Sequence, residues 1–297
     1  MGIVSLLQQS PSLFAAAMFV LGLLIGSFLN VVIYRLPLIL ERQWQAQCAE
    51  LDGKEVAEPT DPFTLASPRS HCPSCKAPVS AMQNIPVISW LVLKGRCAAC
   101  GTRIPARYPA VELATGLLSA AVAWHFGFGF EAACALLLTW FLIPLTGIDL
   151  DHQLLPDVLT LPLVWLGLLA SLFHDTASGA ALPVSPRDAI LGAAAGYLFL
   201  WGVFHAFKLL TGKEGMGYGD FKLFAALGAW MGWQMLPLIL LLSAAVGAIV
   251  GIALVVFRRQ GREVPIPFGP YLAGAGWIAA LWGPQIVGGY LSVAGLH

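Results

Sequence analysis

Eight apolar runs separated by short polar stretches constrain this chain more than any other feature of its sequence. A helix needs roughly 20 apolar residues to cross a hydrocarbon core of about 30 Å, and most of the runs approach that length. They predict an all-α polytopic membrane protein with about eight transmembrane helices. The composition agrees, because 58% of the residues are hydrophobic and only 11% are charged. The runs cover residues 13–34, 109–126, 130–148, 156–174, 188–209, 219–232, 235–257 and 268–292.

The first and the sixth apolar runs differ from the others. The first has no Lys or Arg before it and no small-residue cleavage pattern after it, so we expect a permanent anchor rather than a cleaved signal peptide. The sixth is short, because the sequence between Asp220 and Phe257 barely accommodates two crossings. We expect this segment to be short or to begin below the membrane surface, with a turn at Gly232.

The positive charges predict the orientation of the chain. Nine of the 16 Lys and Arg residues lie in residues 35–107, three in 208–222 and three in 258–262, whereas Arg187 lies apart. With eight spans and the N-terminus outside, all three basic loops face the cytoplasm, where short loops carry the positive excess. The formal net charge is zero, so no global basic field indicates a nucleic-acid partner.

This orientation divides the chain into three parts. Residues 1–35 form the first transmembrane helix, 36–108 a cytoplasmic loop domain, and 109–297 a transmembrane helical core. Within the loop domain, residues 41–68 are polar and rich in proline, which indicates an insertion or a flexible surface.

The loop domain contains two CxxC motifs separated by 21 residues. Two such turns can direct four sulfur atoms at one tetrahedral ion, as in a zinc ribbon. The alternatives are two disulfides or four unused thiols, but the reducing cytoplasm disfavours disulfides. A four-thiolate shell leaves no open position for water, so we expect a structural zinc site. Its ligands are Cys72, Cys75, Cys97 and Cys100.

Two aspartates lie at the margins of apolar runs that otherwise exclude charge. Asp149 ends the third run, and Asp220 ends the glycine-rich turn GMGYGD. Both margins fall on the cytoplasmic side, so the two acids share a depth in the membrane. Two carboxylates within hydrogen-bond distance cannot both ionise readily and therefore share one proton. This pair predicts an aspartic-protease dyad, in which one acid activates water and the other protonates the oxyanion.

The other acids have simpler explanations. Asp151 and Asp157 flank Pro156 and suit the capping or first turn of the next helix, and Asp188 suits a cap on the outer side. Glu112 lies one turn into the second run, where an acid usually has a partner or a task. Lys222 either neutralises a carboxylate or extends its amine to the membrane surface.

Several stretches together resemble the bacterial type IV prepilin peptidases, which act as leader peptidases and N-methyltransferases in pilus and type II secretion systems. The resemblance is carried by GLLIGSFLNVVIYRLP, the CPSC and CAAC motifs, NIPVISWL, RYPAVELATG, IDLDHQLLPD and GMGYGDFKL. It implies that Asp149 and Asp220 are the catalytic pair, the latter within a GxGD motif shared with other intramembrane aspartyl proteases.

The resemblance also implies substrates and a second activity. Prepilins and pseudopilins with a short basic leader would be cut after glycine at the cytoplasmic face of the bacterial inner membrane. The new N-terminal residue would then be methylated from S-adenosylmethionine. No glycine-rich motif after a strand indicates where that methyl donor binds, and Gly95, Arg96 and Glu112 are the candidates near the metal motifs. The oligomeric state is not indicated.

Two other classes of function remain open at this point. In a transporter or channel, Asp149 and Asp220 would relay protons and tolerate replacement by glutamate, but the metal motifs would have no task. In a non-catalytic scaffold of a secretion machine, replacing either aspartate by asparagine would leave pilin processing intact.

Overall fold

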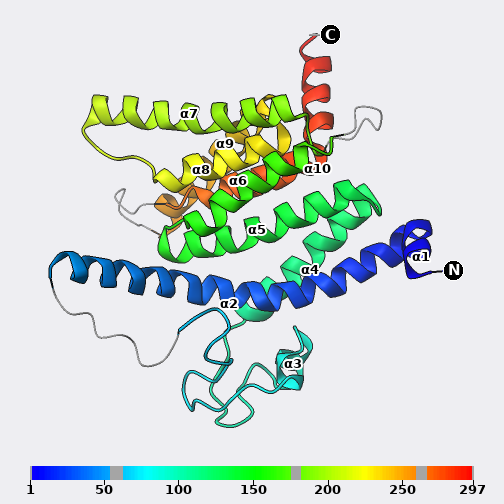
Figure 1. The fold of residues 1–297 in the computed structure, drawn as a ribbon, viewed down its shortest axis with the longest axis vertical. Helices are drawn as coiled ribbons and strands as arrows, with labels where there is room; N and C mark the ends of the chain where they lie inside the picture. The colour runs from blue at the N-terminus through cyan, green and yellow to red at the C-terminus, as the bar shows by residue number, and fades with distance from the viewer. Residues whose placement is uncertain (1, 54–62, 175–181, 259–265, 296–297) are drawn as a thin grey trace. The chain divides into compact units, whose positions relative to one another are not determined.

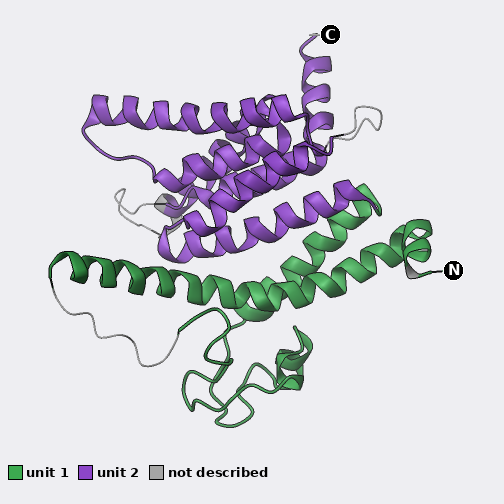
Figure 2. Ribbon diagram, viewed as in Figure 1, with its two compact units in different colours: residues 1–128 green, residues 129–297 purple. Residues whose placement is uncertain are grey.

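The computed structural model describes residues 2–53, 63–174, 182–258 and 266–295, which form two compact units, 1–128 and 129–297 (Figure 2). Within these described ranges the regular structure is helical, and no extended β-strand is present. This confirms the predicted all-α class. Unit 1 contains α1 (Ile3–Gln9), α2 (Pro11–Leu51), η1 (Met82–Asn84), α3 (Ile88–Val92) and α4 (Arg107–Phe126). Unit 2 contains α5 (Phe130–His152), α6 (Asp157–Ser171), α7 (Pro186–Thr211), α8 (Tyr218–Met231), η2 (Trp233–Met235), α9 (Leu236–Arg258) and α10 (Gly269–Val293).

Unit 1 is organised by the packing of α2 against α4, seen in blue and teal in Figure 1. Small residues line the contact. A Cβ atom at Gly22 would lie 2.8 Å from the Cα of Gly116, and one at Gly26 would lie 2.7 Å from the Cα of Glu112. Glycine lets two backbones approach this closely, as is common between membrane helices.

Helix α2 is longer than the predicted first span. It continues past residue 34 to Leu51, and its last turns are largely exposed. Residues 41–51 of the expected insertion or flexible surface therefore form an exposed helix, because Glu, Arg, Gln and Ala in this stretch are good helix formers. The side chain of Gln45 also donates to Glu41 one turn earlier, at 3.3 Å. Residues 54–62 of the same stretch lie outside the described residues.

Unit 2 is built around α8, which is short and buried nearly all round. Helices α6, α7 and α10 contact it (Figure 1). Its large side chains Phe221, Phe224 and Trp230 are at most 1% exposed. A helix that is hydrophobic on every face is stable only when other elements surround it. The indole of Trp230 donates to the backbone oxygen of Leu163 at 2.9 Å, which ties α8 to α6.

The contact between α7 and α8 depends on glycine. A Cβ atom at Gly192 would overlap the carbonyl oxygen of Gly228, and one at Gly196 would lie 2.7 Å from the oxygen of Phe224. The two backbones therefore touch along this line, and only residues without a side chain fit there.

Each of the eight predicted spans coincides with a helix, but not all of them can cross a membrane unaided. Among the described residues, four helical segments are long and apolar enough. Helix α8 has 14 residues, or about 21 Å at 1.5 Å per residue, which is short of the hydrocarbon core. The expected short sixth segment and the turn at Gly232, whose φ is +78°, are confirmed, whereas the number of crossings stays a prediction. The four segments are Pro11–Leu51, Phe130–His152, Pro186–Thr211 and Trp233–Leu254.

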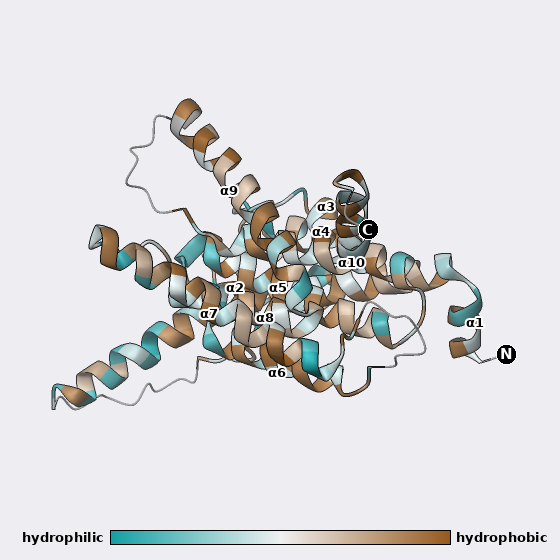
Figure 3. Cartoon of the chain, turned by 90° about the horizontal axis from the view of Figure 1, so that it is seen from above, coloured by the Kyte–Doolittle hydropathy of each residue, from teal (hydrophilic) through white to brown (hydrophobic). Residues whose placement is uncertain are grey.

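Apolar side chains also cover outward-facing surfaces of unit 2. Helix α9 is mostly brown in Figure 3, and its Leu241, Ile249 and Ile252 are each more than 60% exposed. Large exposed apolar surfaces mark contact with a partner or a membrane. On a helix as apolar as α9, they are the surface expected to face lipid.

We expect Gly192→Ala to lower the free energy of unfolding by about 1–3 kcal/mol, the usual cost of forcing a methyl group into a packed core. Denaturation of the detergent-solubilised protein, followed by tryptophan fluorescence, measures this change. Gly202→Ala in the same helix is the matched control, because nothing lies within 4 Å of a Cβ atom there. Equal stability of the two variants would contradict the glycine contact between α7 and α8.

Candidate active site and metal centre

Asp149 lies in the last turn of α5 and is 5% exposed. Its carboxylate oxygen Oδ2 accepts a hydrogen bond from the backbone amide of Gly269, the first residue of α10, at 2.9 Å. Residues 120 positions apart in the chain therefore meet at this acid. Gly269 was not predicted from the sequence, where its only signal is the Pro-Phe-Gly-Pro run at the start of the last apolar segment.

Asp220 lies in the first turn of α8 and is 7% exposed. Its glycine-rich approach ends at Gly217, the residue before the helix, and the Asp220 amide bonds the oxygen of Gly217 at 3.2 Å. The side-chain oxygen Oδ1 of Asp220 is buried and has no hydrogen-bond partner among the described residues. A buried polar atom without a partner is costly, so it marks a place where a ligand or water is expected.

The two acids belong to one unit, and Leu155 lies beside the neighbours of both. A Cβ atom at Gly269, which binds Asp149, would lie 3.1 Å from Cδ2 of Leu155, and one at Gly219, which precedes Asp220, would lie 2.6 Å from its Cβ. Both side chains are shielded from solvent, and charge repulsion is strong in such surroundings. Two carboxylates in this situation are most stable with one ionised and one protonated. Such a pair offers one base and one acid.

The neighbouring charged residues are arranged differently. Asp157 occupies the first turn of α6, as predicted, and forms an ion pair with Lys222. Two roles were expected for Lys222, and the structure shows the first of them. Its amine neutralises a carboxylate, that of the largely exposed Asp157. Asp151 and His152 are exposed near the end of α5.

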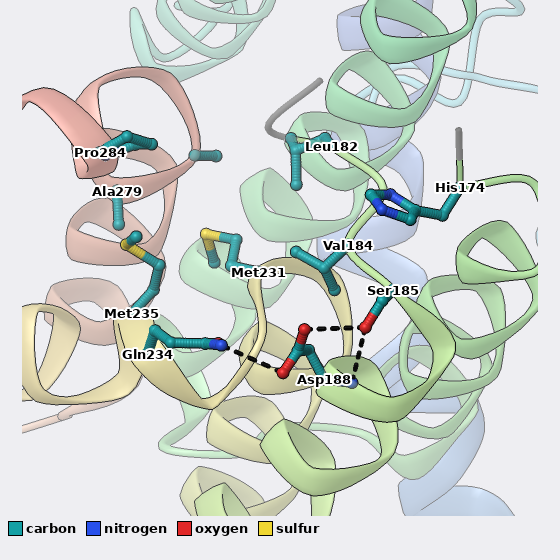
Figure 4. A pocket seen from close by; sticks show the side chains of 11 residues that line it. His174, Leu182, Val184, Ser185, Asp188, Met231, Gln234, Met235, Ala279 and Pro284 are labelled. Atoms are coloured by element: carbon teal, nitrogen blue, oxygen red, sulfur yellow. Dashed lines mark hydrogen bonds between the residues drawn. The ribbon is translucent and has the colours of Figure 1, made fainter. Parts of the chain in front are cut away.

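Asp188 completes the cap of α7 at the other end of unit 2. Ser185 is the N-cap residue and accepts from the amide of Asp188, while Oδ1 of Asp188 accepts from Gln234 at 3.0 Å. These groups line a cavity of about 250 Å³ together with Met231 (Figure 4). Met231 ends α8 and Asp220 lies in its first turn, so roughly 16 Å of helix separates the cavity from Asp220.

The four cysteines of the CxxC motifs come together in unit 1, as predicted. Their Sγ atoms all lie within 4.8 Å of one another. Each motif forms a tight turn in which the first cysteine amide bonds a carbonyl five residues later, at 2.9 Å. The residue after each second cysteine has a positive φ: 59° at Lys76 and 71° at Gly101. This arrangement can hold one metal ion with four sulfur ligands.

The four thiols differ in acidity. Hydrogen bonding with Thr102 lowers the pKa of the Cys100 thiol to about 6, whereas hydrogen bonding with Cys100 and burial raise the pKa of the Cys75 thiol to about 11. The thiolate is the form that binds a metal ion. The Sγ atoms of Cys72 and Cys100 are 3.7 Å apart, and the cysteines of unit 1 form no disulfide in the described part of the chain.

Of the candidates for the methyl-donor site, Gly95 and Arg96 directly precede Cys97, whereas Glu112 lies on α4. Glu112 on α4 accepts from the amide of Val87 at 2.7 Å, so its expected partner is the segment before α3. Val87 has a φ of +61°, an unusual conformation for a β-branched residue. A Cβ atom at Gly95 would lie 2.8 Å from the Trp90 ring, and Arg96 directly precedes the second CxxC motif.

Comparison with known families and proteins gives a consistent result. Residues 20–126 match the bacterial peptidase A24 N-terminal domain, which includes all four cysteines. Residues 136–252 match the type IV leader peptidase family, which includes Asp149 and Asp220. No solved structure gives a significant match.

Curated relatives match the chain over nearly its full length. A protein of Stutzerimonas stutzeri and one of Pseudomonas aeruginosa are each 54% identical to it, over 99% of both chains. A protein of Aeromonas salmonicida is 57% identical over 95% of both chains. All three are named prepilin leader peptidase/N-methyltransferase. With this extent of identity and the two matching domains, the chain belongs to the type IV leader peptidase family.

Proposed function

We propose that this protein is a bifunctional enzyme of the bacterial inner membrane. It cleaves the leader of type IV prepilins and pseudopilins and then methylates the new N-terminal residue. The observation that carries the proposal is the pair of buried aspartates in one unit of a chain that matches named prepilin leader peptidases over nearly its full length.

The proposed cleavage is acid–base catalysis by Asp149 and Asp220. The ionised carboxylate takes a proton from water, and the resulting hydroxide adds to the carbonyl carbon of the scissile peptide bond. The protonated carboxyl donates its proton to the developing oxyanion. Collapse of the tetrahedral intermediate then breaks the C–N bond, with a proton passing to the leaving amine. The unpartnered oxygen of Asp220 supports this assignment, because it requires a water or substrate group beside it.

The substrate class follows from the distribution of charge. A basic leader stays on the cytoplasmic side while the following apolar helix enters the bilayer. The scissile bond then lies at the membrane surface, at the end of α5 and the start of α8, where the two acids occur. We assign residues 109–297 to the protease core and place its active site at the cytoplasmic face.

The second activity is assigned to the loop domain, residues 36–108, and the adjoining start of α4. S-adenosylmethionine supplies an electrophilic methyl group to the free amine of the cleaved pilin. Gly95, Arg96 and Glu112 are the residues that we expect to support its binding. Glu112 fixes the segment before α3 through the amide of Val87, and the absence of a side chain at Gly95 accommodates Trp90.

We further propose that the four-cysteine cluster binds zinc and holds the loop domain together. Four sulfur ligands at this spacing suit a closed tetrahedral site, and such a site has no position left for a reacting water. The metal is therefore assigned a structural task, separate from cleavage at the aspartates.

Asp149→Asn and Asp220→Asn are each expected to reduce kcat for cleavage of a prepilin peptide at least about 1,000-fold, because a neutral amide cannot transfer the proton. Both should still methylate a precleaved pilin peptide. Asp157→Asn is the control and should keep cleavage within threefold, since it loses only a surface ion pair. Full cleavage by either of the first two variants would refute the dyad, and intact processing by both would favour a scaffold.

Cys72→Ser is expected to reduce bound zinc from about one ion per chain to near zero, because three sulfur ligands hold the ion far less tightly. Metal analysis of the purified protein measures this. Cys48→Ser is the matched control, since Cys48 lies outside the cluster on an exposed part of α2. Unchanged zinc in Cys72→Ser would contradict the assigned ligands.

Gly95→Ala is expected to reduce N-methylation of a precleaved pilin peptide at least tenfold while leaving cleavage within threefold. The added Cβ atom displaces the Trp90 ring, and the backbone at φ +66° also disfavours alanine. Gly53→Ala shares the backbone penalty, at φ +68°, but its Cβ atom meets no neighbour within 4 Å. Equal methylation by the two variants would argue against a role for Gly95.

A further inference from the structure

The amide of Gly269 is the group that holds the Asp149 carboxylate in place. Gly269 is buried and begins α10, and its N–H donates to Oδ2 of Asp149 at 2.9 Å. A backbone donor of this kind has no rotamers, so its direction is set by α10 itself. A hydrogen bond to one carboxylate oxygen then fixes the rotation of the carboxylate group.

Residue 269 has no room for a side chain. A Cβ atom there would lie 2.6 Å from Oδ2 of Asp149 and 3.1 Å from Cδ2 of Leu155. The first distance is shorter than any ordinary contact, so a methyl group has to push the carboxylate away from the amide. The backbone of Gly269 is not in the left-handed region, so backbone conformation does not require glycine here. Glycine is required because the Asp149 carboxylate occupies the place of a side chain.

Leu155 links this contact to Asp220. The side chain of Leu155 is 7% exposed and packs near Gly269 on one side. On its other side lies Gly219, where a Cβ atom would be 2.6 Å from the Cβ of Leu155. The start of α10, the turn between α5 and α6 and the start of α8 therefore form one close-packed group around the two acids. A displacement in any of these segments moves one acid relative to the other.

We propose that Gly269 is a positioning residue for cleavage. It acts through Asp149 by fixing the orientation of its carboxylate toward Asp220, while Oδ1 of Asp220 keeps its place free for water or substrate. The inference rests on the proposed aspartate dyad and adds to it the element that aligns the dyad. Reacting groups displaced by about 1 Å lose on the order of 100-fold in rate.

The test compares three glycine-to-alanine variants of α10 in the full-length protein. In Gly269→Ala the added methyl group meets the Asp149 carboxylate. In Gly276→Ala its nearest neighbour is the Leu227 side chain, at 2.5 Å, and in Gly274→Ala it meets nothing within 4 Å. The measurements are kcat and KM for a prepilin peptide, methylation of a precleaved peptide, and the unfolding temperature.

We expect Gly269→Ala to reduce kcat about 100-fold, with KM and methylation within threefold of the unsubstituted protein. Gly276→Ala tests packing damage alone and should keep kcat within threefold even where its unfolding temperature falls. Gly274→Ala should match the unsubstituted protein in every measurement. Wild-type kcat in Gly269→Ala, or an equal loss in Gly276→Ala, would overturn the proposal.

A second measurement does not depend on the folding of Gly269→Ala. In protein labelled with ¹⁵N-glycine, the Gly269 amide proton should resonate downfield, and it should move upfield in Asp149→Ala, where the acceptor is absent. An unmoved resonance would overturn the proposal. The proposed function fails separately, through cleavage by Asp149→Asn or Asp220→Asn. If those variants are inactive and Gly269→Ala is normal, only the positioning role is lost.

Discussion

The removal of two carboxylates from water is the constraint on which the rest of unit 2 depends. A charge in an apolar interior is costly unless it is paired, hydrogen-bonded or neutralised. Asp149 has a backbone amide, whereas Oδ1 of Asp220 has no partner within the described residues. The cost of this arrangement must be offset by the packing around it, to which the buried side chains of α8 contribute.

Glycine residues allow helices and loops of unit 2 to pack in close contact at several points. Gly192 and Gly228 let α7 and α8 touch, while Gly219 and Gly269 let Leu155 and Asp149 approach the starts of α8 and α10. Dispersion forces and backbone contacts replace the hydrophobic effect when helices associate in lipid, so close approach is the main source of stability there. The packing that stabilises the unit is thus also the packing that aligns the acids.

Much of the fold and the site could be predicted because those features are local. The clustering of the four CxxC cysteines, a helix at each apolar run, the turn at Gly232 and the first-turn position of Asp157 each depend on neighbours in the chain, and each is confirmed. The extension of α2 to Leu51 was missed because a polar, exposed helix has no apolar periodicity to reveal it. The hydrogen bond between Val87 and Glu112 and the ion pair between Lys222 and Asp157 join segments that are distant in the sequence. Hydrophobic periodicity describes neighbouring residues and does not predict such contacts.

The sequence by itself determined the class of the protein and the sulfur cluster, and it predicted the two acids, because the rarity of charge in apolar runs and the spacing of cysteines are properties of the chain alone. Only the tertiary structure decided what holds those acids. The amide of Gly269 lies 120 residues from Asp149, and every residue except proline has such an amide. The Gly269 amide reaches Asp149 because of the position at which α10 begins. That position depends on packing among helices rather than on residue type.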